Sequence, residues 1–159
     1  MALEWGAIVT YRYQHTQVAW VVLAAIGLCV AVIVVAGTIT AIEDFELAAV
    51  LAQAAVAVVL MVCLGLFCSL TVRVGEDVVE IRFGPGLVRK RFPIRDIESC
   101  RMVKTSRYDG WGIHHTKGGW LFNVSGFGAV EITMRNGKKY RIGSDEPEKL
   151  EEAIRRYTR

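Results

Sequence analysis

The residues best suited to chemistry are two adjacent histidines in a glycine-rich stretch and a serine next to a cysteine. His114 and His115 follow Asp109 closely, but adjacent side chains usually point apart, and the chain lacks the clustered cysteine and histidine spacing of a zinc site. Ser99 and Cys100 adjoin, yet no GxSxG turn surrounds the serine and the sequence places no base beside either group. We therefore expect no catalytic residue, no metal and no cofactor, and we predict that the protein is not an enzyme.

The four cysteines show no spacing that indicates a disulfide framework. Cys29 and Cys63 lie inside long apolar runs, Cys68 lies near the end of the second run, and Cys100 is alone in the polar part of the chain. Without a CxxC pair, the pattern favours reduced thiols with a packing role.

A basic group in the second half is the more informative candidate. Arg89, Lys90 and Arg91 are consecutive, and Arg73 comes just after the second apolar run. Basic side chains next to a membrane attract anionic lipid headgroups, by about 1 kcal/mol each. In a strand, Arg89 and Arg91 would share one face and Lys90 would lie on the other, so ordinary solvated strand charge is the alternative. These four residues are the candidate lipid-binding or partner-binding residues. Nucleic acid is not an expected partner, because acids are interleaved with the bases and no recognition motif is present.

The charges are distributed so unevenly that the chain must contain two different parts. Of 19 lysines and arginines, 18 lie from Thr71 onward together with 12 of the 16 acids, which gives that part a net formal charge of +6. Between Arg12 and Arg73 the only charges are three acids within residues 43–46. The first part is not the core of a soluble protein.

Residues 18–42 and 47–70 predict two transmembrane helices. The first run has 25 positions without a charge, about 37 Å of helix, and a hydrocarbon core is about 30 Å thick. The run is too long for a signal peptide, and neither run has the polar face of a soluble helix. The short connection at residues 43–46 forces the helices to be antiparallel. We expect residues 1–17 to be a cytoplasmic segment, 18–70 a transmembrane hairpin and 71–159 a soluble domain.

The orientation follows from the charges that flank the two runs. Arg12 precedes the first run and Arg73 follows the second, whereas the connecting turn carries only acids. Basic residues favour the cytoplasmic side, so we predict a multi-pass protein of the cell (inner) membrane with both termini in the cytoplasm.

From Thr71 onward the apolar period changes to two, which predicts an antiparallel sheet. Asn136-Gly137 is the clearest turn signal and predicts a hairpin with a type I′ turn. Residues 106–118, rich in glycine and aromatic groups, are expected to form a long loop. About seven strands are expected, at residues 70–74, 78–83, 87–92, 97–104, 119–124 and 129–134 and through Tyr140 and Ile142.

The chain ends in an amphipathic helix. Leu150, Ala153, Ile154 and Tyr157 form one apolar stripe, which must pack on the sheet. A capping box between Asp145 and Glu148 is expected to start this helix.

Short antiparallel strands followed by one amphipathic helix suggest a pleckstrin-homology (PH) type barrel, and the sequence resembles bacterial PH-like membrane proteins. The most recognisable stretches are residues 92–97 (FPIRDI), 110–113 (GWGI), 130–132 (VEI) and 142–147 (IGSDEP). The resemblance covers the two apolar runs and the soluble part. It implies an α+β membrane protein in which a transmembrane hairpin precedes a PH-like antiparallel β-barrel with a C-terminal capping helix, and it implies no chemistry.

These observations favour a membrane-anchored, non-enzymatic interaction scaffold or accessory subunit. An anionic-lipid-sensing module is the alternative, and a membrane enzyme or transporter component ranks lower. The expected partners are the lipid bilayer and a protein, with anionic lipid and a second copy of the chain as further candidates.

Overall fold

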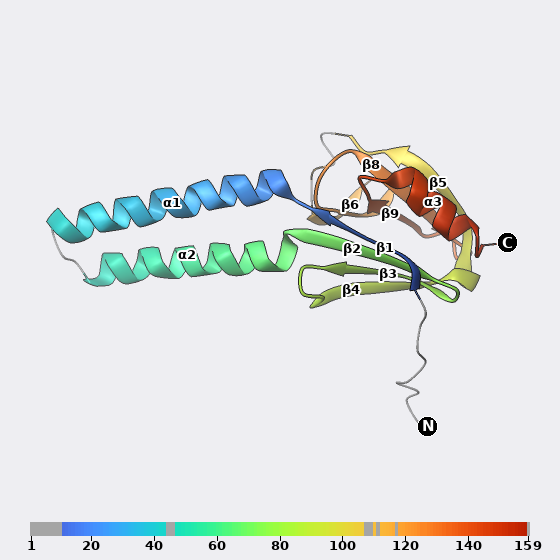
Figure 1. Cartoon of the computed structure of the whole chain (residues 1–159), viewed down its shortest axis with the longest axis horizontal. Coiled ribbons are helices and arrows are strands. Elements are labelled where there is room, and N and C mark those ends of the chain that lie inside the picture. The colour runs from blue at the N-terminus through green and yellow to red at the C-terminus, as the bar shows by residue number, and fades with distance from the viewer. Residues whose placement is uncertain (1–10, 44–46, 107–109, 111, 117, 159) are drawn as a thin grey trace, which may run out of the picture.

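The computed structural model is an α+β fold with two long apolar helices, two sheets and a C-terminal helix (Figure 1). It describes residues 11–43, 47–106, 110, 112–116 and 118–158, the side chains of 40–43 excepted. In chain order the elements are β1 (Tyr11–Val18), α1 (Trp20–Glu43), α2 (Leu47–Phe67), β2 (Ser69–Gly75), β3 (Val78–Phe83), β4 (Val88–Pro93), the 3-10 helix η1 (Ile94–Asp96), β5 (Ile97–Lys104), β6 (Gly112–Thr116), β7 (Gly119–Asn123), β8 (Gly128–Met134), β9 (Lys139–Gly143) and α3 (Pro147–Arg155).

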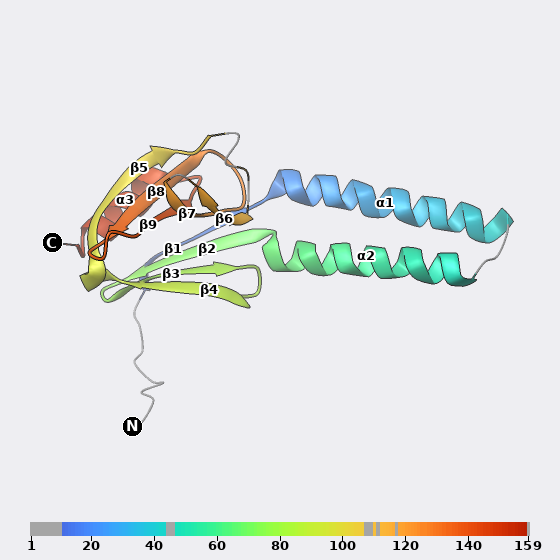
Figure 2. The same cartoon turned by 180° about the vertical axis from the view of Figure 1, so that it is seen from behind.

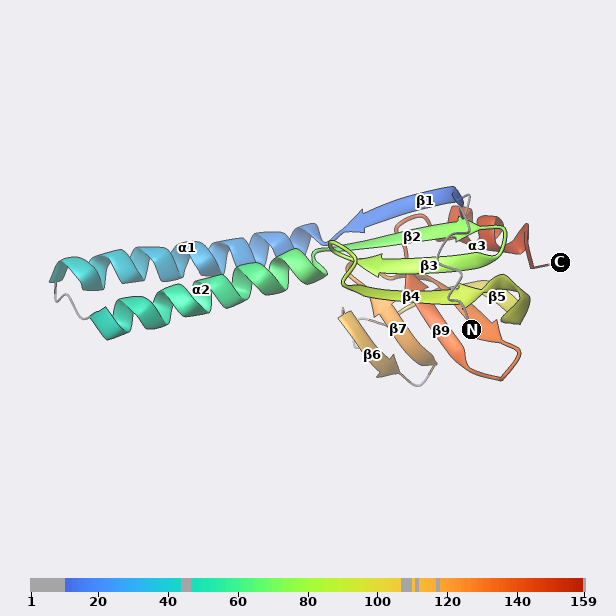
Figure 3. The same cartoon turned by 90° about the horizontal axis from the view of Figure 1, so that it is seen from below.

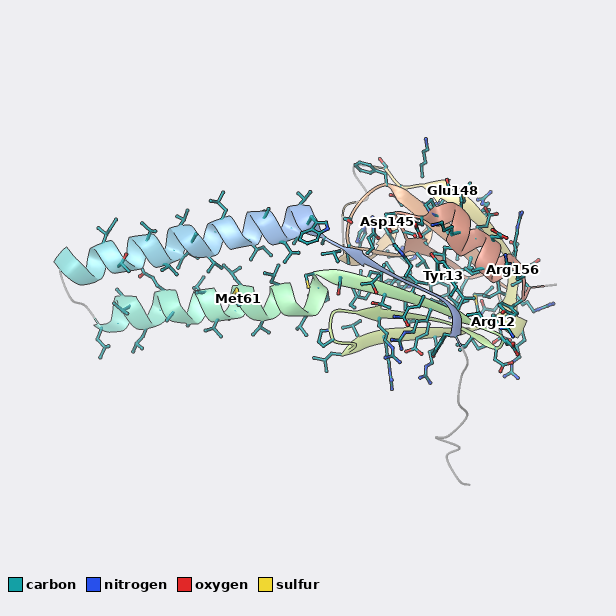
Figure 4. All side chains as sticks on the ribbon, in the orientation of Figure 1. Arg12, Tyr13, Met61, Asp145, Glu148 and Arg156 are labelled. Carbon is teal, nitrogen blue, oxygen red and sulfur yellow. The ribbon has the colours of Figure 1, made fainter. Side chains whose placement is uncertain are left out.

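Helices α1 and α2 form a hairpin that extends from one end of the sheets (Figures 1 and 2). They have 24 and 21 residues, about 36 and 32 Å of helix. Both are long and apolar enough to cross a membrane. Their side chains are mostly exposed and almost all carbon, whereas nitrogen and oxygen atoms gather on the sheets and α3 (Figure 4). The two predicted apolar helices are therefore present.

The hairpin is inserted between two strands that pair with each other, which sequence analysis missed. Val18 at the end of β1 lies opposite Ser69 at the start of β2, and the Ala19 N–H donates to the Cys68 carbonyl at 2.8 Å. Residues 11–17, expected to belong to a separate N-terminal segment, and Val18, expected to start the first apolar helix, are thus an edge strand of the folded domain. The domain also extends upstream of Thr71, because Ser69 and Leu70 belong to β2 rather than to the second apolar helix.

The described strands form two separate sheets instead of one closed barrel. The first has the order β1-β2-β3-β4 and the second the order β5-β8-β9-β7-β6, with β7 and β9 as a parallel pair. The chain passes from the first sheet to the second at Pro93 and η1. Figure 3 shows the first sheet face-on, its strands running roughly along the direction of the hairpin.

The core lies between the two sheets. On β2 the alternate residues Leu70, Val72 and Val74 are buried, as the predicted period of two requires. They pack in one apolar cluster with side chains of the second sheet, such as Ile132 and Ile142.

Helix α3 covers this core through its apolar stripe, as predicted. Leu150 and Ile154 are fully buried, and Ala153 and Tyr157 pack against the cluster. The predicted capping box is absent, because the N-cap is Glu146 and makes no side-chain cap. Asp145 instead contacts His15 of β1, with His15 Nε2 and Asp145 Oδ1 2.6 Å apart.

Two further local expectations need correction. Part of the predicted loop at residues 106–118 is strand β6, which pairs with β7. The β8–β9 hairpin is confirmed, but its turn is not type I′, since only Gly137 in that turn has a positive φ, +79°. The Gly137 N–H donates to Met134 O and the Met134 N–H donates to Lys138 O, the pattern of a three-residue loop with a glycine bulge.

Candidate functional site

The histidines on β6 point to opposite faces of the second sheet. His114 lies opposite Leu121 and His115 opposite Trp120, whose ring it meets edge-on at 5.7 Å. Asp109 lies outside the described residues. Among the residues that the structure describes, no three potential metal-ligating side chains come together.

Cys100 is a packing residue on β5. Its side chain is buried, and its Sγ lies 3.9 Å from the Glu151 carbonyl oxygen. Burial raises the pKa of the Cys100 thiol, and the nearby charge of Glu151 raises it further. A nucleophilic cysteine needs the opposite environment, one that favours the thiolate.

The predicted basic residues divide between two faces of the first sheet. In the strand register, Arg73 and Arg91 lie on either side of Glu80, and Arg89 lies opposite Arg82. Directly opposed residues share a face, so all five side chains belong to the outer face, away from the core. We call Arg73, Glu80, Arg82, Arg89 and Arg91 the basic face.

Glu80 is the centre of the basic face, and its side chain is fully buried although it lies outside the apolar core. Its carboxylate accepts hydrogen bonds from Arg82 Nε, from Arg91 Nε at 3.1 Å and from the Tyr11 hydroxyl at 2.7 Å. Sequence analysis missed Glu80 and Tyr11 and left Arg82 outside the four candidate residues. The spacing of Glu80 and Arg82, two apart in a predicted strand, was the available signal, whereas nothing local indicates that Tyr11 reaches them from residue 11.

The groups around Glu80 favour its ionised form. Burial by itself raises its pKa, but the hydrogen bonds from Arg82 and Tyr11 and the charges of Arg82 and Arg91 lower the pKa of Glu80 to about 2. Glu80 is therefore ionised at any physiological pH and neutralises one guanidinium of the basic face.

Four guanidinium groups and one carboxylate leave the basic face with a formal excess of three positive charges. Arg89 forms no ion pair with any residue in the described ranges. Arg73 stacks over the Tyr11 ring at 5.5 Å, and its Nε has no hydrogen-bond partner in the described part of the chain. This face can bind anionic groups through Arg89, while Arg82 and Arg91 are occupied by Glu80 and the Arg73 Nε is buried.

Lys90 belongs to a different surface. It lies opposite Ile81 on the side of β4 that faces the second sheet, and its Nζ sits 4.9 Å from the centre of the Tyr140 ring. It borders a cleft of about 570 Å³ whose other lining residues include His115, Trp120, Lys138 and Lys139. The structure thus separates Lys90 from the three arginines with which it was grouped.

Comparison of the sequence with known protein families finds no match, and no curated protein matches it significantly.

Proposed function

We propose that the protein is a membrane-anchored, PH-like interaction domain that works as a non-enzymatic scaffold or accessory subunit. Its hairpin spans the bacterial inner membrane and its sheets stand in the cytoplasm. One observation carries the proposal: two exposed apolar helices are inserted between the paired strands β1 and β2, so both leave the domain side by side at one end.

The exposed surface of the hairpin supports membrane insertion. Large apolar side chains such as Val32, Leu51 and Val58 are more than half exposed over both helices. A soluble monomer rarely exposes so extended an apolar surface, and helices satisfy their own backbone hydrogen bonds in lipid. The bilayer is the environment that suits both properties.

The position of the hairpin between β1 and β2 also supports a topology in which the segments before and after it lie on the same side of the membrane. Because β1 and β2 belong to one sheet, the residues before α1 and after α2 must stand on the same side of any membrane that the hairpin crosses. The basic residues Arg12 and Arg73 lie on these two strands and favour the cytoplasm as that side.

The PH-like assignment is supported by two mainly antiparallel sheets that share one core, which an amphipathic helix covers. Each sheet ends in described strands with a free edge, and an added partner strand can extend such an edge. Fold alone names no partner. We therefore assign the domain the general role of protein recognition at the membrane face.

Thiol labelling in intact cells tests the topology. In a chain whose native cysteines are replaced, a cysteine at Lys138 should be shielded from an impermeant reagent and one at Asp44 should react. Photo-crosslinking tests the role. A crosslinker at Trp120, on β7, should yield a discrete protein adduct, whereas one at Leu51, on α2, should yield lipid adducts. The reverse labelling pattern would overturn the topology, and no protein adduct at Trp120 or other exposed sheet positions would overturn the scaffold role.

Recognition of anionic lipid is the second candidate, and Arg89 favours it. Its guanidinium forms no ion pair within the described ranges and lies on β4, close to the β3–β4 turn, which contacts the end of α2. Basic groups at such a level attract anionic headgroups by about 1 kcal/mol each.

A further inference from the structure

An apolar cavity of about 590 Å³ lies where the hairpin meets the two sheets. Gly112 and Asn123 complete a wall that is otherwise made of six apolar side chains, namely Val22, Phe67, Phe83, Val88, Ile113 and Val124. Val22 belongs to the first turn of α1 and Phe67 is the last residue of α2. The cavity is therefore continuous with the surface that the proposed function places in the bilayer.

The one polar side chain in this wall needs no ligand. The Asn123 amide nitrogen donates to Gly126 O at 3.1 Å, and its amide oxygen accepts from the Ser125 N–H at 3.2 Å. The Asn123 side chain is thus already hydrogen-bonded within the protein, and the other side chains of the wall are apolar and offer a polar ligand no partner. Cavities of a few hundred Å³ with such walls suit apolar ligands.

The surroundings of the cavity also face the bilayer. Trp20, at the start of α1, is 73% exposed, and Leu87, beside the β3–β4 turn, is 77% exposed. The turn rests against α2, because the Gly84 N–H donates to Ser69 O at 2.9 Å and a side chain at position 84 would overlap the carbonyls of Gly65 and Leu66. Exposed tryptophan and leucine at this level are typical of the boundary between headgroups and acyl chains.

We infer that this cavity binds an acyl chain of a membrane phospholipid. The inference rests on the proposed anchoring, which supplies the bilayer at its mouth. Val88, which is 37% exposed, forms the wall on the side of the first sheet, and Ile113 and Val124 form the wall on the side of the second sheet. A lipid bound there would contact the hairpin and both sheets at once.

The test uses the full chain in nanodiscs that contain a phospholipid with a photoactivatable group in the middle of one acyl chain. Mass spectrometry then maps the adducts. Adducts on α1 and α2 are expected from any lipid around the hairpin, so they report anchoring alone. Adducts on Ile113, which lies on β6, and on Val124, which directly follows β7, are expected only if an acyl chain enters the cavity.

Adjacent residues provide the matched variants. Val88→Trp should fill the cavity from the side of the first sheet and abolish the adducts on Ile113 and Val124, whereas Leu87→Trp adds the same side chain outside the cavity and should leave them unchanged. Ile113→Trp, which fills the cavity from the opposite wall, is the second test if Val88→Trp disturbs folding, and thermal unfolding identifies such a case. Free fatty acid can be added at a concentration equal to that of the phospholipid. If it removes the adducts, the occupant is free acid rather than phospholipid, and the assignment is overturned.

Two other results would also overturn the inference. Adducts confined to the helices would show that the polypeptide itself closes the cavity to lipid, although the hairpin is still in the bilayer. Adducts on the second sheet that survive Val88→Trp and Ile113→Trp would place the lipid on the outer surface. If the helices themselves gave no lipid adducts, the proposed anchoring would fail first.

Discussion

The helical hairpin and the sheets are stabilised in opposite ways. Each helix makes its backbone hydrogen bonds within about four residues, and its side chains face outward. The sheets depend on distant pairs, such as Val18 with Ser69, whose partners are separated by the whole hairpin. Charge follows the same division: among the described residues the buried carboxylates are Glu80 and Glu131, both belong to the sheets, and each is paired with two arginines.

This difference implies that the hairpin is replaceable while β1 is not. A helical hairpin that begins and ends at one strand pair can be removed without changing the sheet register. A strand that supplies the edge of a sheet cannot be removed without exposing its neighbour.

The largest expected effect is the contrast between two shortened variants of the chain. A variant in which Asn-Gly replaces residues 20–67 should be soluble and folded, because Ala19 and Cys68 already form a hairpin pair that a two-residue loop can close. A fragment of residues 71–159 should aggregate, since it lacks β1 and the fully buried Leu70. Loss of one such leucine costs about 2–5 kcal/mol, a large share of a typical 5–15 kcal/mol domain stability. Circular dichroism and size-exclusion chromatography measure both, and a well-folded 71–159 fragment would contradict the role of β1.

Next in size is the loss of the buried charge in the first sheet. In the full chain in non-ionic detergent, Glu80→Gln should reduce the free energy of unfolding by about 3 kcal/mol, because it leaves Arg82 and Arg91 without their counter-ion. Denaturant unfolding monitored by tryptophan fluorescence measures the change. Glu98→Gln, on β5, is the matched control, since Glu98 is exposed and should give almost no change.

The pH dependence of stability gives Glu80 a separate signature. Its pKa is lowered from 4.5 to about 2 on folding, so the stabilisation is fully present above about pH 4.5 and is lost as the pH falls toward 2. The shift corresponds to about 3 kcal/mol. Wild type should therefore lose stability across this window more steeply than Glu80→Gln. Parallel curves for the two proteins would show that Glu80 titrates normally in the folded state.

A smaller effect is expected inside the hairpin. A Cβ at Gly37 would overlap the amide oxygen of Gln53 on α2, whereas Gly27 has no neighbour within 4 Å. Gly37→Leu should thus weaken the contact between the helices by about 1–3 kcal/mol, and Gly27→Leu should not. Helix content during titration of detergent micelles with dodecyl sulfate measures the difference. Equal effects would show that the hairpin does not depend on this close approach, and the Gly37→Leu, Gln53→Ala double variant should recover part of the loss.

The smallest expected effect concerns the two faces of β4. Arg89→Gln should lower retention of anionic lipid, measured by native mass spectrometry of the full chain, by about fivefold, which corresponds to about 1 kcal/mol. Lys90→Gln, one residue away on the opposite face, should leave it unchanged. The difference should fade as salt rises from about 0.1 M to 1 M, where the screening length falls to about 3 Å. Equal losses in both variants would indicate attraction by net charge without a preferred face.

Several features of this protein were predictable because they depend on neighbouring residues. The uninterrupted apolar runs predict both helices, the Asn136-Gly137 pair predicts the β8–β9 hairpin, and the stripe through Leu150 and Ile154 predicts α3. The alternation of β4 also correctly separates Lys90 from Arg89 and Arg91. Each of these patterns lies within about ten residues, so it can be recognised without knowledge of the rest of the chain.

Only the tertiary structure decides what lies opposite each strand. Residues 11–18 are a polar, aromatic stretch that predicts no strand, and they become β1 because β2 offers an edge 50 residues later. Asp145 suits a helix cap, but His15 on that same strand takes its carboxylate. Arg89 is available for anions because Glu80, on the neighbouring strand, contacts Arg82 and Arg91 instead. In each case several partners are chemically equivalent along the sequence, and the register of the sheet selects one of them.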